Sequence, residues 1–397
     1  MAGDRLTLPA RHRIVAGTSC EGLPLPLLSS TLCNSDASHE SAIENGKSQG
    51  RKRMRAPRYR LGMAALVGSI LSATGAAWAE TPEEFFRGKT ITAVVPFAPG
   101  GGYSIYTQIA ARHLPRFVPG QPTIVAQHMP GAGGILASNH MFNVARRDGT
   151  VMAMVSDSVA LASVIDADKI KYKVNDFIWV GAIERVNNVL AVRADTGVKS
   201  FPDLETKEVA LGASGPGSPT SLLPALLRWL APVKLKTVEG YPGISQMFAA
   251  VERGEVAGMT VSWTIFKSLK PEWFKTGYMV PVVQFGSTRE GDLKDVPLAN
   301  DIARTPEQKA VSRFMASNVD VGRSFILPPG VPADRVAALR SAFDRMVRDA
   351  AFKEEIAKAG FDLSPATGQQ VQEAVALATR LDDKLAATIR GLVTTAK

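Results

Sequence analysis

The stretch that decides the fold is ITAVVPFAPGGGYS, at residues 91–104. It begins with a β-branched apolar run typical of a buried strand, passes through three consecutive glycines, and leads into a segment with helical periodicity. Glycine permits backbone conformations closed to other residues and lets a ligand approach the main chain. The first N–H groups of the following helix lack partners and lie at the positive end of its dipole. This junction therefore predicts an anion site.

Two further junctions repeat this pattern of strand, glycine-rich loop and helix. MPGAGG at residues 129–134 follows one predicted strand, and GASGPGS at residues 212–218 follows another. In open α/β sheets, ligands bind at the carboxyl edge where such junctions lie. Each junction alone is equally well explained as a tight turn, but the three together favour an anion-binding cleft.

The remaining sequence alternates short β-rich runs with amphipathic helical patterns. Such alternation, with nearly continuous apolar strands, predicts an α/β fold with parallel sheets covered on both faces. Residues 80–397 are too many for one core and suggest two lobes of about 150 residues each. The predicted strands are residues 91–95, 123–127, 151–155, 177–183, 189–192, 209–212, 235–238, 256–261, 279–285 and 325–327. The predicted helices are residues 104–114, 134–144, 221–230, 244–253, 306–314, 333–348 and 352–359.

Residues 51–79 have the pattern of an export signal. Six basic residues precede an apolar run that ends in Ala77-Trp78-Ala79, an A-x-A cleavage pattern. A membrane anchor is the weaker alternative, because Gly, Ser and Thr dilute the run and a span needs about 20 apolar residues. We therefore expect residues 54–79 to be a signal peptide cleaved after Ala79, and the mature protein to be periplasmic. Residues 1–53 are expected to be disordered or a misassigned upstream extension that precedes a true start at Met54.

Composition narrows the possible functions of the chain. Hydrophobic residues make up 45% and charged residues 21%, which excludes a largely disordered chain. Residues 80–397 carry 36 Lys/Arg and 32 Asp/Glu, a net charge of only +4, so nucleic acid is not an expected partner. Both cysteines, Cys20 and Cys33, precede the expected cleavage point, so the mature chain has neither a disulfide nor a catalytic thiol.

Common motifs of enzymes are absent from the sequence. The glycine run 100–105 ends in Ile where a dinucleotide fingerprint needs Gly, and Gly212-Ala213-Ser214-Gly215 is followed by Pro216 where a nucleophile elbow needs Gly. His113, His128 and His140 match no zinc-ligand spacing. The sequence therefore nominates no catalytic residue, cofactor or metal ligand.

At its glycine-rich junctions, the sequence resembles the periplasmic substrate-binding receptors of tripartite tricarboxylate transporters, the Bug family. The resemblance covers essentially residues 85–380 in the family's order. It rests on ITAVVPFAPGGG at 91–102, MPGAGG at 129–134, DGT at 148–150, GASGPGS at 212–218, VEGYPG at 238–243, RGEV at 253–256, DVP at 295–297 and GRSFILPPGVPADRV at 322–336.

This resemblance implies a type II periplasmic-binding-protein fold, with two α/β lobes joined by strands that cross twice. Lobe one would comprise residues 80–187 plus 320–397, and lobe two residues 188–319. It further implies an exported, non-enzymatic receptor that captures a small organic carboxylate between the lobes. The partners would be that carboxylate and the inner-membrane permease subunits of a tripartite tricarboxylate transporter.

The resemblance also implies how the ligand is held. In such receptors, one ligand carboxylate lies between the two glycine loops and is bound largely by backbone N–H groups and water. Carried over by position, the ligand-binding residues are Gly101, Gly102, Tyr103, Ser104, Gly133, Gly134, Ser156, Asp157, Ser158, Ser214, Gly217, Ser218, Tyr241 and Trp263.

Some positions leave alternatives open. Many members carry an acid where this chain has Ser104, so an amino-acid ligand is less favoured than a plain carboxylate such as a dicarboxylate or an aromatic acid; Asp157 is a candidate substitute. Arg323 is either a second anchor or part of a surface salt bridge near the hinge. Tyr241 and Trp263 are either cleft walls or core.

Two other functions compete with the receptor hypothesis. The first is an exported α/β hydrolase that acts on carboxylate-bearing substrates, with Ser214 or Ser218 as nucleophile. The second is a ligand-binding partner of a sensor, docked on a signalling protein instead of a permease. Turnover of substrate would distinguish the first of these from a receptor.

Overall fold

The computed structural model describes residues 80–165 and 169–394. These residues all belong to one compact unit. The predicted signal peptide and residues 1–53 lie outside the described residues. Within the described ranges, no helix has both the length and the apolar character needed to cross a membrane.

The first sheet combines strands from the beginning and the end of the described chain. Its strand order is β11-β4-β10-β3-β1-β2. β1 pairs in parallel with β2 and β3, whereas β10 runs antiparallel between β3 and β4. The strands are β1 (Thr90–Val95), β2 (Thr123–His128), β3 (Val151–Met154), β4 (Ile178–Ala182), β10 (Ser324–Leu327) and β11 (Ala366–Thr367).

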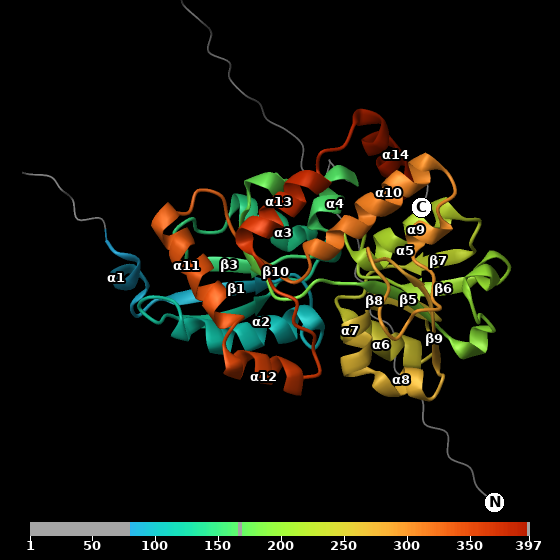
Figure 1. Ribbon diagram of the computed structural model, residues 1–397, viewed down its shortest axis with the longest axis horizontal. Helices are drawn as coiled ribbons and strands as arrows, with labels where there is room; N and C mark the ends of the chain where they lie inside the picture. The colour runs from blue at the N-terminus through green and yellow to red at the C-terminus, as the bar shows by residue number, and fades with distance from the viewer. Residues whose placement is uncertain (1–79, 166–168, 395–397) are drawn as a thin grey trace, which may run out of the picture. The chain divides into compact units, whose positions relative to one another are not determined.

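The second sheet is built from the middle of the chain. Its order is β7-β6-β8-β5-β9, with β6 parallel to β7 and β8, and β5 antiparallel to β8 and β9. Figure 1 shows this sheet on the right and the first sheet on the left. The strands are β5 (Asn188–Arg193), β6 (Val209–Gly212), β7 (Leu235–Val238), β8 (Gly258–Ser262) and β9 (Met279–Gln284).

The two sheets share one design that departs from the wholly parallel sheets we expected. In each sheet one internal strand, β10 or β5, runs antiparallel to both of its neighbours and is the first strand after the chain crosses from the other sheet. Because such a strand enters from the opposite side, it runs against its neighbours. The fold is therefore a mixed α/β, two-lobed fold, and the residue boundaries assigned to the lobes stay a prediction.

Helices cover both sheets, and the C-terminal segment is divided between them. α11 and α13 pack on β4, and α12 packs on α2, whereas α14 contacts α4, α5 and α10. Around the first sheet lie α1 (Pro82–Phe86), α2 (Gly102–His113), α3 (Ile135–Asn143), α4 (Val159–Ile165), α11 (Ala333–Met346), α12 (Ala350–Lys358) and α13 (Gly368–Ala378). Around the second lie α5 (Pro219–Leu230), α6 (Ile244–Glu252), α7 (Trp263–Leu269), α8 (Pro271–Lys275), α9 (Ala299–Ile302) and α10 (Pro306–Ala316), followed in the chain by α14 (Asp383–Thr394).

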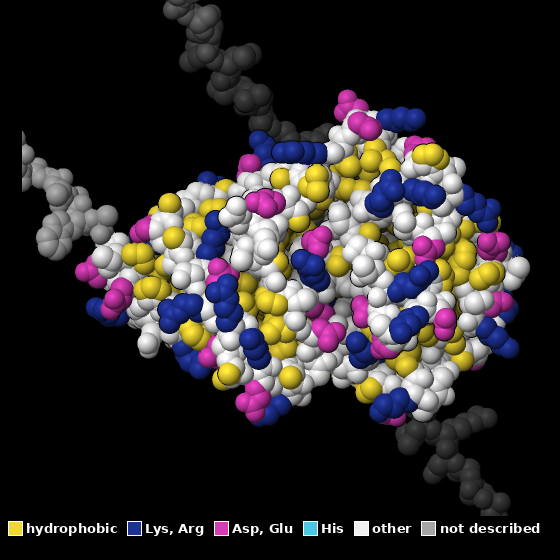
Figure 2. All heavy atoms as spheres, viewed as in Figure 1, with side chains coloured by type: hydrophobic (Ala, Val, Ile, Leu, Met, Phe, Trp, Pro, Cys, Tyr) yellow, Lys and Arg dark blue, Asp and Glu magenta, His cyan; other side chains and the backbone are white. Residues whose placement is uncertain are grey.

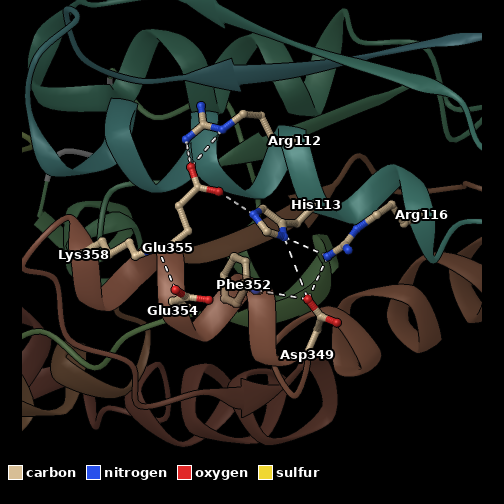
Figure 3. A network of polar contacts seen from close by, with 8 residues as sticks. All are labelled: Arg112, His113, Arg116, Asp349, Phe352, Glu354, Glu355 and Lys358. Carbon is tan, nitrogen blue, oxygen red and sulfur yellow. Dashed lines mark hydrogen bonds and ion pairs between the residues drawn. The ribbon is translucent and has the colours of Figure 1, made fainter.

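Helix α2 is held firmly at its carboxyl end. Arg112 and His113 both contact the carboxylate of Glu355 on α12, and Arg116 Nη2 lies 2.7 Å from Asp349 Oδ1 (Figure 3). The hydrogen bonds from His113 and Arg112 lower the pKa of Glu355, so the carboxylate stays charged. This network fixes the direction of α2, whose amino end faces the second lobe.

The surface carries charges of both signs. On the face shown in Figure 2, basic and acidic side chains are interspersed among apolar ones. The exposed ion pairs of the described chain include Arg289 with Asp301 at 2.6 Å and Lys275 with Glu272 at 2.8 Å. The face shown in Figure 2 therefore has no continuous stripe of side chains that carry charges of one sign.

Candidate functional site

The two glycine-rich loops of the first lobe lie side by side because β1 and β2 are neighbouring parallel strands. Met129 N, where the second loop begins, donates to Val95 O at 2.8 Å. The first loop also touches the second lobe, since Ala98 N donates to Pro242 O at 3.0 Å. The carboxyl edges of the two sheets therefore face each other across these loops.

A partly open cavity of about 30 Å³ lies between the lobes at this edge. A cavity needs about 10–15 Å³ for one water, so this conformation has room for about two. Both lobes contribute to its wall: the lining residues are Phe97, Gly102, Tyr103, Asp157, Asn188, Ser214, Pro219, Thr220, Gly243, Ile244, Met247, Thr260, Val261, Ser262, Ile265 and Arg323.

The amino end of α2 forms one wall of the cavity. Gly101 is the N-cap of this helix and gives it no side-chain cap. A Cβ on Gly102 would lie 2.3 Å from Ile265 Cδ1, so the absence of a side chain lets Ile265 come this close. Arg323 Nη2 lies at an ordinary contact distance of 3.6 Å from the same position. The wall thus combines the positive end of a helix dipole with a nearby guanidinium group.

Tyr103, Asp157 and Asn188 form a hydrogen-bonded group on the same wall. The Tyr103 hydroxyl donates to Asp157 Oδ1 at 2.9 Å and accepts from Asp157 N at 3.1 Å, while Asn188 Nδ2 donates to Asp157 Oδ2 at 3.1 Å. Burial, together with the charge of Asp157, raises the pKa of Tyr103 far above its usual range, so the hydroxyl remains a donor. Both oxygens of Asp157 therefore have a protein donor.

Arg323 is buried on the cavity wall, and the surface-salt-bridge interpretation of this residue is wrong. Its guanidinium carbon lies 4.0 Å from the centroid of the Tyr103 ring, and its Nε lies 3.7 Å from Glu184 Oε2. Burial opposes its charge, but Tyr103 and Glu184 more than offset this effect, and the pKa of Arg323 is raised. Burial raises the pKa of Glu184 to about 7, although the guanidinium opposes the shift.

The second glycine loop makes a different contact, which we name the clasp: residues 132–135 of lobe one against residues 215–218 of lobe two. A Cβ on Gly133 would lie 2.4 Å from Ser218 N, so backbone meets backbone there. Ser158 Oγ donates to Gly217 O at 2.6 Å and pairs with Ser156 Oγ at 2.8 Å. The clasp closes the lobes beside the cavity.

The predicted site residues therefore separate into groups. Four of them line the cavity: Gly102, Tyr103, Asp157 and Ser214. Three belong to the clasp: Gly133, Gly217 and Ser218. Two support the clasp through hydrogen bonds: Ser156 and Ser158. Gly101 and Gly134 adjoin these groups: the Cβ position of Gly101 lies 3.5 Å from Ile244 Cβ, and that of Gly134 lies 3.2 Å from Ser156 Cβ.

The three predicted residues that remain lie neither in the cavity lining nor at the clasp. Ser104 Oγ pairs with His128 Nε2 at 2.8 Å, and Trp263 Nε1 donates to Asp292 Oδ1 at 2.9 Å. The ring of Tyr241 packs 3.5 Å from the Cβ position of Gly212. For Tyr241 and Trp263 this is the core alternative that the sequence left open.

The sequence reasoning missed several polar residues of the wall, above all Thr260, Ser262 and Asn188. Thr260 and Ser262 lie at the carboxyl end of β8, the edge where the junction rule predicts ligands. That rule could have selected them, but β8 lacks the glycine-rich loop that marked the other junctions. Asn188 begins a crossing strand, a position that only the topology reveals.

Among the residues that the structure describes, no group of three or more His, Cys, Asp or Glu side chains could hold a metal ion. Ser214 Oγ lies 3.3 Å from Thr220 Oγ1, and Ser218 Oγ donates to Gly215 O at 2.7 Å. The described residues that line the cavity include Ser214 but neither Ser218 nor a histidine.

The sequence profile of the tripartite tricarboxylate transporter family receptors matches residues 109–387 of this chain. The chain belongs to that family. The match covers β2 to β10 and reaches into α14, so it spans both sheets.

Curated relatives agree with this assignment. The chain is 28% identical over 206 residues to BugT of Bordetella pertussis, covering 49% of this chain and 62% of that protein. It is 26% identical over 198 residues to a UPF0065 protein of Agrobacterium vitis, covering 48% of this chain and 56% of the relative. The chain thus spans somewhat more than half the length of the curated relatives that it matches.

Solved structures show the same fold at low identity. The periplasmic binding protein BugD is 17% identical, with a TM-score of 0.61, covering 77% of this chain and 97% of that one. MatC of Rhodopseudomonas palustris, solved with malate, is 20% identical with a TM-score of 0.59, covering 77% and 99%. A second R. palustris protein, solved with adipate, is 20% identical with a TM-score of 0.59, covering 78% and 97%.

Proposed function

We propose that this protein is a receptor that binds a small organic carboxylate between its two lobes and presents it to a membrane permease. The observation that carries the proposal is the cavity between the lobes, which is lined by the amino end of α2, by the buried Arg323 and by hydroxyl groups of the other lobe. Such an arrangement attracts an anion. Family membership supports the same conclusion, and two structural neighbours were solved with the dicarboxylates malate and adipate.

Binding would act through closure of the lobes. A ligand that contacts Gly102 and Tyr103 on one lobe and Ser214 on the other favours the closed state over the open one. In the present conformation the cavity of about 30 Å³ is too small for malate, so the lobes must separate to admit it. We propose that the hinges lie where the chain crosses, near residues 188 and 320.

A binding screen tests the proposal. The purified protein is titrated calorimetrically with mono-, di- and tricarboxylates, and its radius of gyration is measured by small-angle scattering with and without the best ligand. We expect saturable binding, a smaller radius in the complex, and an unchanged ligand spectrum by NMR after prolonged incubation. A ligand converted to product would instead support the hydrolase alternative, and no binding of any carboxylate would overturn the proposal.

Export and delivery are part of the same proposal. We propose that residues 54–79 direct export and that cleavage follows Ala79, which N-terminal sequencing of the periplasmic protein would test. We propose further that the permease belongs to the tripartite tricarboxylate class. Deletion of the receptor gene should then abolish uptake of the radiolabelled ligand, and uptake that persists would argue for a sensor role.

A further inference from the structure

Three polar side chains on the cavity wall lack hydrogen-bond partners. Within the described chain, Arg323 Nε and Nη1, Thr260 Oγ1 and Ser262 Oγ are buried without an acceptor or donor. The exposed fractions of these side chains are 3%, 0% and 1%. Buried polar groups are nearly always hydrogen-bonded, and the cost of leaving a charged one unsatisfied is higher still. Arg323 Nε faces Glu184 Oε2 at 3.7 Å, and the oxygens of Glu184 lack hydrogen-bond partners as well. It is therefore Nη1 of Arg323 and the two hydroxyls that point to something the cavity is built to receive.

The three side chains come from opposite lobes. Thr260 and Ser262 are two residues apart on β8, so they share one face of the second sheet. Arg323 immediately precedes β10 in the first sheet, and its Nη2 lies 3.6 Å from the Cβ position of Gly102 at the amino end of α2. An anion between them would accept hydrogen bonds from both lobes at once.

The charges around the cavity are few. Among the described residues of its wall, Arg323 is the only cation and Asp157 the only carboxylate. Asp157 already accepts hydrogen bonds from Tyr103 and Asn188, so it has no need of a cationic ligand group. Glu184 adds a second acid 3.7 Å from the guanidinium. A second carboxylate on the ligand would therefore be buried without a cation to balance it.

The rest of the wall is largely apolar. Phe97, Ile244, Met247, Val261 and Ile265 all line the cavity. They offer contact area to hydrocarbon and no partner to a polar group.

We infer that Arg323, Thr260 and Ser262 anchor the carboxylate of a ligand that carries one carboxylate on an uncharged, largely apolar body. This inference rests on the proposed function and deepens it, because it selects among carboxylates. It sets this chain apart from structural neighbours that were solved with dicarboxylates. The charged hydrogen bonds of Arg323 supply affinity, and the hydroxyls of β8 connect that anion to lobe two.

Pairs of matched ligands test whether the site prefers a monocarboxylate to a dicarboxylate. The purified protein is titrated with butyrate against succinate, and with hexanoate against adipate, so that each pair differs only by the second carboxylate. Each monocarboxylate should bind at least about tenfold more tightly than its partner, a difference of about 1.4 kcal/mol. Norleucine, which adds an ammonium group to hexanoate, should bind more weakly than hexanoate. Tighter binding of either dicarboxylate or of norleucine would overturn the inference but leave the receptor function intact.

Variants test the anchor itself. Arg323→Gln should weaken binding of the preferred monocarboxylate by about 10- to 100-fold, because a charged hydrogen bond contributes about 1.5–3 kcal/mol. The double variant T260V/S262A, which keeps the buried ion pair, should weaken it by about tenfold. Ser221→Ala is the matched control: Ser221 is another buried serine whose Oγ lacks a partner, but it does not line the cavity, and its loss should leave affinity unchanged.

The outcomes separate the two proposals. If Arg323→Gln does not fold, T260V/S262A decides the matter by itself. Carboxylate binding that survives all of these substitutions contradicts the anchor and leaves the receptor proposal standing. Absence of binding by every carboxylate tested on the unmodified protein contradicts both.

Discussion

The two glycine loops of lobe one look alike in sequence but do different things in the structure. The first, PGGG at residues 99–102, has a left-handed backbone only at Gly100, with φ of +91°, and then enters α2. The second, GAGG at residues 131–134, has positive φ at every position, from +48° at Ala132 to +156° at Gly131. The first ends on the cavity wall, and the second forms the clasp.

The difference shows two separate uses of glycine. At Gly102 the missing side chain leaves room for Ile265 beside the amino end of a helix. At Gly133 it allows a left-handed turn and lets the backbone of one lobe touch that of the other. Binding and closure are therefore assigned to neighbouring loops, and substitutions should separate them.

The largest effect is expected from Gly133→Ala in the clasp. The new Cβ would lie 2.4 Å from Ser218 N, where no flexible side chain can yield, so the lobes could not close. Carboxylate affinity should fall by about 100-fold, or about 3 kcal/mol, measured by calorimetry. Gly88→Ala is the matched control, because Gly88 has a φ of +69° against +67° at Gly133 but nothing within 4 Å of its Cβ position.

Both alanine variants carry a similar left-handed strain of about 1–2 kcal/mol, seen as lower stability. Only the Gly133 variant should also lose affinity. Equal affinities in the two variants would mean that closure does not depend on the clasp.

The second prediction concerns how the stability of the protein depends on pH. Ionisable groups are buried beside the cavity, whereas the clasp consists of hydroxyl and backbone groups. The pKa of Glu184 rises from 4.5 to about 7 on folding, so between these values the folded protein keeps a proton that the unfolded chain has lost. Its contribution to the free energy of unfolding therefore falls as pH rises from about 5 to 7, by on the order of 2 kcal/mol. In Glu184→Gln this fall should vanish.

Urea unfolding of the wild type and of Glu184→Gln at pH 5, 6, 7 and 8 measures the difference. Ser158→Ala, which removes a hydrogen bond to Gly217 of the clasp but no ionisable group, should reproduce the wild-type pH profile at a lower stability. A difference between wild type and Glu184→Gln that stays constant with pH would show that Glu184 is ionised throughout.

A smaller effect on carboxylate affinity is expected from alanine substitutions at two neighbouring glycines of the first loop. Gly102→Ala would press on Ile265 Cδ1 at 2.3 Å, a flexible atom that can move toward the cavity. Affinity should fall by about tenfold, with little change in stability. Gly101→Ala meets Ile244 only at an ordinary 3.5 Å and should bind as the wild type does. Similar losses in both variants would contradict the assignment of Gly102 to the wall.

The smallest effect is expected at Ser104, the residue that the family resemblance placed among the ligand contacts. Its hydroxyl pairs with His128 Nε2 and accepts from Gln108 at 2.9 Å, and it is absent from the cavity wall. Ser104→Ala should cost about 1 kcal/mol of stability in thermal unfolding and leave carboxylate affinity unchanged. A clear loss of affinity would return Ser104 to the site.

Much of the fold was predictable because strands and glycine junctions are local patterns. β6 and β7 have the predicted bounds, and the other long strands match within one or two residues. The short strand β11 and helices such as α7 and α13 were missed, since their formation depends on packing against β8 and β4. Thr260 and Ser262 were missed because an ordinary strand end has no mark in the sequence.

The sequence alone determined the alternation of strands and helices, the family, and the loops that carry the glycines, because backbone freedom and periodicity are properties of neighbouring residues. Only the tertiary structure decided which loop borders the cavity and which one clasps the opposite lobe. It also decided that Arg323, distant in the chain from both loops, is buried beside Tyr103. These results depend on how two crossing strands, β5 and β10, bring the edges of separate sheets together. No local sequence pattern encodes contacts between residues that lie so far apart in the chain.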